Sequence, residues 1–384
     1  MAAKMGQELP FTEAEHNRRI ARARAAMAEA GIDAALLFDP ENIFYLTGYQ
    51  SIGYFTFQAM LIPPKGKPVL ISRVVNKYMA AITPTLGDFV EIVDTADPVE
   101  VTLAAIADHT TSGVLGLEMA AWYMTANVYE AIKSRAGRET RDWSGVIESH
   151  RIIKGPEELD RMRQAARACE AGMHAALEAT RVGATENDIA AEMHRASIAA
   201  GSEYLGHAPL AVSGERSAVC FTMWRRRVLE AGDCVLIENG ACIDRYHALQ
   251  ARVAVLGEPS DEIKRVSDAI LAGLNALLET VRAGITSGEA DAACRREIAK
   301  AGFGDRFIHR VAYSVGIGFP PNWSEGKTLS LRPDDPTPLQ AGMTFHSVPS
   351  IFGGDFGMVF SETFHVTETG CEVLTEFPRK LLVQ

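Results

Sequence analysis

The chain has 384 residues, of which 47% are hydrophobic and 23% are charged, and its formal net charge is −11. This length fits two domains of an ordinary globular protein, and the negative charge argues against nucleic acid or anionic membrane surfaces as partners. The N-terminal segment has no apolar signal core, no stretch could span a membrane, and the six cysteines show no metal-binding spacing, so we expect a cytoplasmic protein with reduced cysteines.

Residues 1–150 show alternating strand and helix patterns, which are typical of an α/β domain. Apolar periodicity predicts helices over 12–30, 99–107 and 121–134. It predicts strands over 34–38, 59–62, 68–72, 89–92 and 113–117, of which the second and third form a hairpin. No glycine-rich phosphate loop occurs among them, so a nucleotide-binding role is unsupported.

Residues 151–384 begin with Pro156 and two glutamates, a typical helix start. Helices are predicted over 157–179, 186–200, 261–283 and 288–301. Extended segments are predicted over 209–213, 220–224, 309–319, 342–349, 358–367 and 371–377. We expect paired helices packed on a curved, mostly antiparallel sheet.

The segment Gly232–Gly257 has the pattern of a β-hairpin. An apolar run, Val235–Ile237, ends in Glu238, and Asn239-Gly240 predicts the turn. The second strand alternates, so that one face carries His247, Leu249, Ala251 and Val253 and the other carries Tyr246, Ala248, Gln250 and Arg252. A carboxylate that closes an apolar strand is unfavourable unless it is paired or used, so Glu238 is a candidate functional group; a strand-end glutamate in water is the alternative.

This hairpin resembles the central hairpin of the methionine aminopeptidase/prolidase/creatinase superfamily, in which Tyr246 and Arg252 match a Tyr-x-x-acid-x-x-Arg pattern. NIFYLTGY at residues 42–49 and HRIIKGPEELD at residues 150–160 resemble two further superfamily signatures. The chain looks most similar to the metal-free ectoine hydrolase/creatinase-like branch. The resemblance implies a creatinase-like α/β domain over 1–150 and an α+β pita-bread catalytic domain over 151–384.

Metal-dependent members of this superfamily hold two ions with five side chains. The resemblance places these five positions at Glu238, Leu249, Tyr313, Val348 and Glu362. Leucine and valine donate nothing, and a two-metal site needs about five or six protein donors, so we expect no metal and no other cofactor. His247 and His346 could rebuild a site, although a lone strand histidine is more often a packing residue.

The superfamily fold would bring Glu238 and Glu362 into one pocket. Two neighbouring carboxylates push their pKa values apart, so that one stays ionised and the other holds a proton. Such a pair could hydrolyse a C–N bond, one carboxylate attacking or activating water and the other protonating the leaving nitrogen; a remnant pair without turnover is the alternative. The catalytic histidine of creatinase-like enzymes falls on Phe221, which leaves His247, His346 and Tyr313 as further catalytic candidates.

The candidate substrate-binding residues are Tyr54, Phe57, Phe221, Trp224, Gln250 and Arg252. Tyr54 and Phe57 match the region that creatinase-like dimers lend to the neighbouring subunit, so the resemblance implies a homodimer; ordinary packing is the alternative for these aromatics. We expect a metal-independent hydrolase that opens a C–N bond in a small amidine, guanidine or related solute, cationic or zwitterionic. The alternatives are a metal-dependent Xaa-Pro dipeptidase and a binding protein that kept the fold without catalysis.

Overall fold

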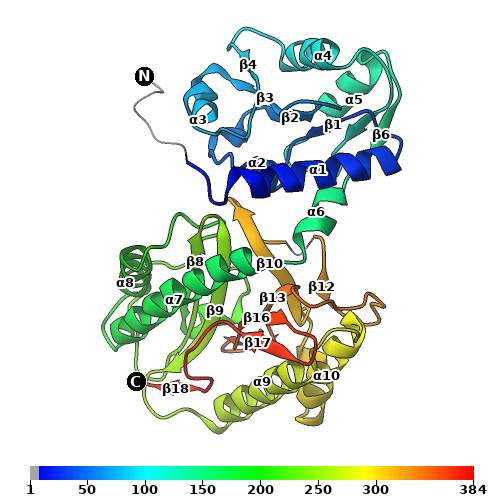
Figure 1. The fold of residues 1–384 in the computed structure, drawn as a ribbon. Coiled ribbons are helices and arrows are strands. Elements are labelled where there is room, and N and C mark those ends of the chain that lie inside the picture. The colour runs from blue at the N-terminus through cyan, green and yellow to red at the C-terminus, as the bar shows by residue number, and fades with distance from the viewer. Residues whose placement is uncertain (1–7, 326) are drawn as a thin grey trace. The chain divides into compact units, whose positions relative to one another are not determined.

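The computed structural model describes residues 8–325 and 327–384, and the chain divides after Arg151 into two compact units (Figure 1). The N-terminal unit is an α/β domain around one six-stranded sheet, as the alternation of elements predicted. Its strand order is β4-β3-β2-β1-β5-β6. The strands are β1 (Ala34–Leu37), β2 (Gln58–Ile62), β3 (Val69–Arg73), β4 (Phe89–Ile92), β5 (Leu115–Leu117) and β6 (Thr140–Asp142).

Short polar side chains cap the N-termini of three helices of this unit. The helices are α1 (Glu13–Glu29), α2 (Pro40–Thr47), α3 (Lys77–Ala81), α4 (Pro98–His109), α5 (Ala126–Arg135) and α6 (Val146–Arg151). Thr12, Asp97 and Thr125, at the starts of α1, α4 and α5, each accept a hydrogen bond from a backbone N–H of the first turn that would otherwise lack a partner. The predicted strand and helix sequence of this half is confirmed, and the NIFYLTGY signature lies mostly on α2.

The segment around the 3₁₀ turn Gly53–Phe55 presents different side chains from those we expected. Tyr54 is buried, with its ring 5.0 Å from that of Tyr123, and Phe57 packs edge-on against Phe38 at 6.1 Å. Tyr54 thus lies in the domain's interior, and Phe57 is partly buried against its core. The exposed apolar side chains here are Ile52 and Phe55, which are 59% and 76% exposed.

The C-terminal unit is built on a ten-stranded, mostly antiparallel sheet, which confirms the predicted fold class. Its main strand order is β17-β16-β13-β10-β9-β8-β7. These strands are β7 (Leu210–Ser213), β8 (Cys234–Ile243), β9 (Tyr246–Val255), β10 (Ala312–Phe319), β13 (Thr344–Ser347), β16 (Thr363–Val366) and β17 (Cys371–Val373). β11 (Asn322–Ser324) and β12 (Ser330–Leu331) pair with β10, β18 (Leu382–Val383) pairs with β9, and β14 (Ser350–Ile351) pairs with β15 (Met358–Val359).

Two pairs of helices pack on this sheet (Figure 1). The pairs are α7 (Pro156–Ala179) with α8 (Glu186–Ala199), and α9 (Asp261–Thr280) with α10 (Ser287–Lys300). Val235, Ile237 and Ala241 of β8 share one apolar core with α7 and α8. Because successive side chains of a strand point to opposite faces, Leu236 and Glu238 face away from that core. The helices thus cover one face of β8 and leave Glu238 on the other.

The turn of the central hairpin lies five residues beyond the predicted Asn239-Gly240. β8 continues to Ile243, Asn239 pairs with Gln250, and the chain reverses at Asp244-Arg245, whose φ values are 47° and 64°. Two positive φ values are the requirement of a type I′ turn, which Asn-Gly satisfies more readily than Asp-Arg. Tertiary contacts decide the position, because the Arg245 side chain is fully buried and donates hydrogen bonds to the carbonyls of Gly318 and Tyr204.

Within residues 8–325 and 327–384, no helix is both long and apolar enough to cross a membrane.

Candidate active site

The C-terminal unit contains a cavity of about 270 Å³ on the face of β8 that carries Glu238. Strands and loops from several parts of the unit meet there, and most of the surface is apolar. The lining residues are His207, Leu210, Val212, Ser217, Val219, Cys220, Phe221, Thr222, Leu236, Glu238, His309, Arg310, Tyr313, Asn322, Trp323, Ser324, Val348, Ser350, Phe352 and Val359. Of the predicted catalytic residues, the cavity wall therefore includes Glu238 and Tyr313.

Glu238 is the carboxylate of this cavity. Burial raises its pKa from 4.5 to about 7, and no hydrogen bond or ion pair to its side chain occurs in the described part of the chain. A carboxyl group with this pKa is divided between its ionised and protonated forms near neutral pH. Glu238 can therefore take a proton or attack an electrophilic carbon without first leaving a partner.

Replacing Glu238 by Gln should change how stability depends on pH. Between pH 4.5 and about 7 the folded wild-type protein binds more protons at this position than the unfolded chain, so its free energy of unfolding falls as pH rises. The glutamine does not titrate. As pH rises from 4 to 8, the free energy of unfolding of Glu238→Gln should therefore increase relative to that of the wild type by up to about 3 kcal/mol, measured by urea unfolding. A difference that does not vary with pH would contradict the raised pKa.

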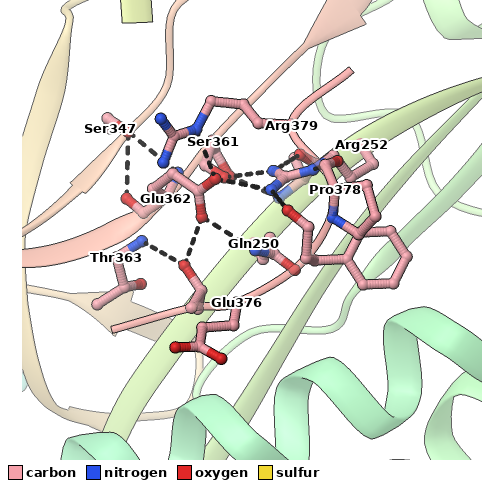
Figure 2. Close-up of polar contacts among 12 residues, drawn as sticks. Gln250, Arg252, Ser347, Ser361, Glu362, Thr363, Glu376, Pro378 and Arg379 are labelled. Atoms are coloured by element: carbon pink, nitrogen blue, oxygen red, sulfur yellow. Dashed lines mark hydrogen bonds and ion pairs between the residues drawn. The ribbon is translucent and has the colours of Figure 1, made fainter. Parts of the chain in front are cut away.

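Glu362 does not share the cavity with Glu238, which corrects our expectation. Its carboxylate accepts hydrogen bonds from Gln250, Arg252, Thr375 and Arg379, at 2.9, 2.7, 2.6 and 3.0 Å (Figure 2). Gln250 and Arg252 point to one face of β9, whereas Glu238 lies opposite Ala251 and so points to the other. The sheet therefore separates the two carboxylates.

The same contacts reassign two predicted substrate-binding residues. Arg252 is fully buried and, besides Glu362, donates to the carbonyls of Ser361, Phe377 and Pro378. Gln250 is also buried and donates its amide N–H to Glu362. Together they join β9 and β16 to the C-terminal segment, and neither lines the cavity.

His247 is a structural residue. Its Nε2 accepts a hydrogen bond from the backbone N–H of Gly206 at 3.0 Å, and its Nδ1 lies 3.0 Å from the carbonyl oxygen of Arg245, to which it donates. Burial lowers the pKa of this imidazole to about 3, so it stays neutral. With both nitrogens occupied and no place in the cavity wall, His247 has no free atom for catalysis or for a metal.

Tyr313 and His346 are brought together. The Tyr313 hydroxyl lies 2.8 Å from Nδ1 of His346 and accepts a hydrogen bond from Nε1 of Trp323 at 3.1 Å. Nε2 of His346 lies 2.7 Å from the hydroxyl of Ser361. Of these four residues, Tyr313 and Trp323 line the cavity, whereas His346 and Ser361 do not, and His346 is joined to the wall through Tyr313.

The remaining aromatic candidates have different positions. Phe221 lies in a turn at the cavity mouth, not in the predicted strand, with 73% of the residue exposed and φ at 62°. Positive φ is uncommon for a bulky residue, so this loop holds Phe221 at some cost in strain. Trp224 packs edge-on against His194 and is not part of the wall.

Four polar groups near the site escaped the sequence analysis: His207, His309, Arg310 and Ser361. The first three line the cavity, and burial lowers the pKa of His309. Residues 309 and 310 begin a predicted extended segment and His207 precedes another, and neither position indicates function by its local pattern. Ser361 directly precedes Glu362, and its hydroxyl lies beside His346.

The donor set of the cavity does not fit the metal pair that metal-dependent relatives use. Of the five matched positions, Glu238, Tyr313 and Val348 line the cavity, Leu249 is fully buried, and Glu362 is on the opposite face. In the described residues, three His, Cys, Asp or Glu side chains come within 4.8 Å of one another only at Asp39, Glu118 and Glu148, in the N-terminal unit. The cavity wall also includes His207, His309 and Cys220, but no three of these donors come within that distance of one another, and a zinc site needs three or four protein ligands.

Comparison with known proteins identifies relatives over the whole length of the chain. Residues 160–368 match metallopeptidase family M24, and residues 19–153 match the creatinase/prolidase N-terminal domain. The chain is 31% identical to the ectoine hydrolase of Halomonas elongata, with 98% of this chain and 99% of the relative covered. It is 26% identical to the Xaa-Pro dipeptidase of Pyrococcus furiosus, with 93% and 97% covered.

The crystal structure of the X-Pro aminopeptidase from Thermotoga maritima has a similar fold, with a TM-score of 0.82 and 26% identity. That similarity covers 95% of this chain and 99% of the aminopeptidase. The family match spans more than half of the chain, and these relatives are hydrolases. The chain therefore belongs to metallopeptidase family M24, in the two-domain creatinase/prolidase arrangement.

Proposed function

We propose that this protein is a metal-independent cytoplasmic hydrolase that opens a C–N bond in a small amidine or related solute, with Glu238 as its nucleophile or base. The observation that carries the proposal is the unpartnered carboxylate of Glu238 in an apolar cavity. The cavity wall has Tyr313 and Val348 at two other positions where metal-dependent relatives are expected to have ligands. The six cysteines are free, which fits a reducing compartment.

The cavity supports a small substrate. Its volume of about 270 Å³ falls below the range of roughly 300–1,000 Å³ that is usual for drug-sized ligands. An ionised Glu238, together with the faces of Tyr313 and Trp323, suits a substrate with a delocalised positive charge such as an amidinium group. Arg310 at the edge of the same cavity suits a substrate that also carries a carboxylate.

The chemistry requires two events at one carbon. Glu238 either attacks the carbon or removes a proton from a water that attacks it, and the nitrogen that leaves must gain a proton. Glu362 cannot supply that proton because its carboxylate accepts hydrogen bonds on the other face of β9.

The test is turnover of a panel containing ectoine, hydroxyectoine, creatine, related amidines and Xaa-Pro dipeptides, with Glu238→Gln as the negative control. Ectoine is included because it is a cyclic amidine and a relative with 31% identity is an ectoine hydrolase. Hydrolysis of an amidine by the wild type alone would support the proposal. Hydrolysis of dipeptides would favour the Xaa-Pro dipeptidase alternative, which the relative from Pyrococcus furiosus suggests, and no turnover across the panel would favour the binding-protein alternative.

Metal removal should leave this activity unchanged. The purified protein should contain less than one equivalent of transition metal by elemental analysis, because a tight zinc site needs about three protein ligands and no three His, Cys, Asp or Glu side chains gather in the described part of the cavity wall. Turnover should be the same with and without a chelator. Two tightly bound ions per chain, lost together with activity, would contradict the proposal and favour a dipeptidase.

We also propose a homodimer in which the segment around Phe55 completes the partner's site. Closed two-fold dimers are the commonest assemblies, and Ile52 and Phe55 expose large apolar side chains. Light scattering should give about twice 41.6 kDa for the wild type, and the double variant Ile52→Ser/Phe55→Ser should shift toward the monomer. Ile198→Ser, at a similarly exposed position on α8, is the control. A monomeric wild type would contradict the proposal.

A further inference from the structure

Three buried side chains form a continuous hydrogen-bonded chain that starts in the cavity wall. Tyr313 on β10 is joined to His346 on β13 at 2.8 Å, and His346 is joined to Ser361, just before β16, at 2.7 Å. Two further donors hold the ends: Nε1 of Trp323 donates to the Tyr313 oxygen, and the N–H of Ala251 donates to the Ser361 oxygen at 2.6 Å. All three side chains are at least nine-tenths buried.

Counting protons restricts this chain to two arrangements. Burial lowers the pKa of His346 to about 3, so near neutral pH its ring is neutral and carries one N–H. The three side chains then carry three exchangeable protons, one each on Tyr313, His346 and Ser361. Only two hydrogen bonds join these side chains. One hydroxyl proton must therefore point away from the chain, from Tyr313 in one arrangement and from Ser361 in the other.

The two arrangements correspond to the two tautomers of His346. With the proton on Nδ1, the imidazole donates to Tyr313, Ser361 donates to Nε2, and the Tyr313 hydroxyl is free to donate into the cavity. With the proton on Nε2, Tyr313 is occupied as a donor to His346. The cavity favours the first arrangement, because Glu238 lines it as an acceptor. Burial, and after it the charge of Glu238, raise the pKa of Tyr313 well above its usual value, so the hydroxyl keeps its proton until the leaving nitrogen takes it.

We propose that Tyr313 donates the proton to the leaving nitrogen, and that His346, protonated at Nδ1 and fixed by Ser361, is the positioning residue that directs the Tyr313 hydroxyl into the cavity. This inference rests on the proposed function and fills the acid role that Glu362 cannot take. The resulting tyrosinate oxygen accepts two N–H hydrogen bonds, from Trp323 and His346.

The protons balance in both possible roles of Glu238. If Glu238 takes a proton from water as the water attacks carbon, Tyr313 gives one to the nitrogen as the C–N bond breaks, and transfer from Glu238 to the tyrosinate restores both groups. If Glu238 itself attacks, the water that later hydrolyses the ester returns its proton to the tyrosinate. Each route consumes one water and needs no other reactant.

The first experiment needs no substrate. Nitrogen chemical shifts of ¹⁵N-histidine-labelled protein, assigned by comparison with His346→Asn, report which imidazole nitrogen carries the proton. We expect Nδ1–H in the wild type, and a fall in its population in Ser361→Ala, which lacks the hydroxyl donor to Nε2. An Nε2–H ring in the wild type would overturn the positioning role whether or not a substrate has been found.

The second experiment measures kinetics on the compound that the wild type hydrolyses. Tyr313→Phe and His346→Leu should each lower kcat by at least about 100-fold with little change in KM, because general acid help is worth about 10²–10⁴. The double variant should be little worse than either single one, since the two act as a unit. His346→Asn retains an amide N–H near the position of Nδ1 and should recover part of the loss.

The control is Tyr246→Phe, which removes another buried hydroxyl, one that donates to Glu158 and lies outside the cavity wall. It should leave kcat unchanged even if it lowers the melting temperature. If Glu238→Gln abolishes turnover but Tyr313→Phe does not, the proposed function stands and this inference is wrong. If the wild type hydrolyses nothing, the proposed function fails, and the tautomer measurement still decides how Tyr313 is oriented.

Discussion

Glu238→Gln should lower kcat/KM at least 100-fold, roughly the least that general acid–base help is worth, while the protein remains folded. The amide has nearly the same shape as the carboxylate but neither accepts a proton from water nor attacks carbon effectively. If Glu238 forms a covalent ester, the loss should be larger still, because the step that splits the barrier disappears. Steady-state kinetics together with thermal unfolding of both proteins measure the two parts of this expectation.

The pH profile of the wild type gives an independent reading of the same residue. Because the ionised form is the reactive one, kcat/KM should rise with pH through an apparent pKa near 7, the value to which burial raises Glu238. Glu258→Gln, a surface change at a side chain that is 84% exposed, is the control and should match the wild type. Turnover by Glu238→Gln at the wild-type rate would exclude a carboxylate mechanism and direct attention to His207 and His309 in the same cavity.

Glu362→Gln should act on stability instead, lowering the free energy of unfolding by about 3–5 kcal/mol, the usual effect of breaking a buried ion pair. The substitution leaves the guanidinium of Arg252 fully buried without its counter-charge and weakens the contact with Arg379 (Figure 2). Urea unfolding measures the loss. Activity measured below the unfolding transition should fall far less than in Glu238→Gln, since the carboxylate does not line the cavity.

Two further variants distinguish the effect of breaking the buried Glu362–Arg252 pair on stability from the effect of removing a carboxylate charge elsewhere. In Glu362→Gln/Arg252→Met both charges are removed, so the double variant should be less destabilised than the sum of its single variants. Glu372→Gln, on the neighbouring strand β17, removes a half-exposed carboxylate that pairs with Arg163 and should cost about 1 kcal/mol or less. A Glu362→Gln protein with normal stability but no activity would contradict this prediction and support catalysis by Glu238 and Glu362 together.

Local patterns predicted the elements of both domains well. The strand Phe89–Ile92 was predicted with the same ends, and the helix predicted over 99–107 is α4, Pro98–His109. The apolar period and the capping residues that mark such elements lie within the element itself. For that reason the fold class could be assigned without any knowledge of distant contacts.

The position of the hairpin turn could not be obtained in this way. Asn239-Gly240 has the better turn chemistry, but the Asn239 side chain donates to the carbonyl of Cys169 on α7, and the strand continues past it. Arg245 is stabilised where the chain does turn, by carbonyls at Gly318 and Tyr204 that are distant in sequence. A few such contacts outweigh a local propensity worth about 1 kcal/mol.

The sequence by itself determined the elements and the two-domain fold class, because residue type and periodicity are local properties, and its motifs carried the resemblance to the family. Tertiary structure alone decided which polar groups meet. Side chains alternate between faces along a strand, so a difference of one residue places Ser361 beside His346 and Glu362 beside Arg252 on the other face. Glu238 and Tyr313 therefore line the same cavity and Glu362 does not. The alternation within one strand can be read from the sequence, but which side chains of distant strands meet on a given face cannot.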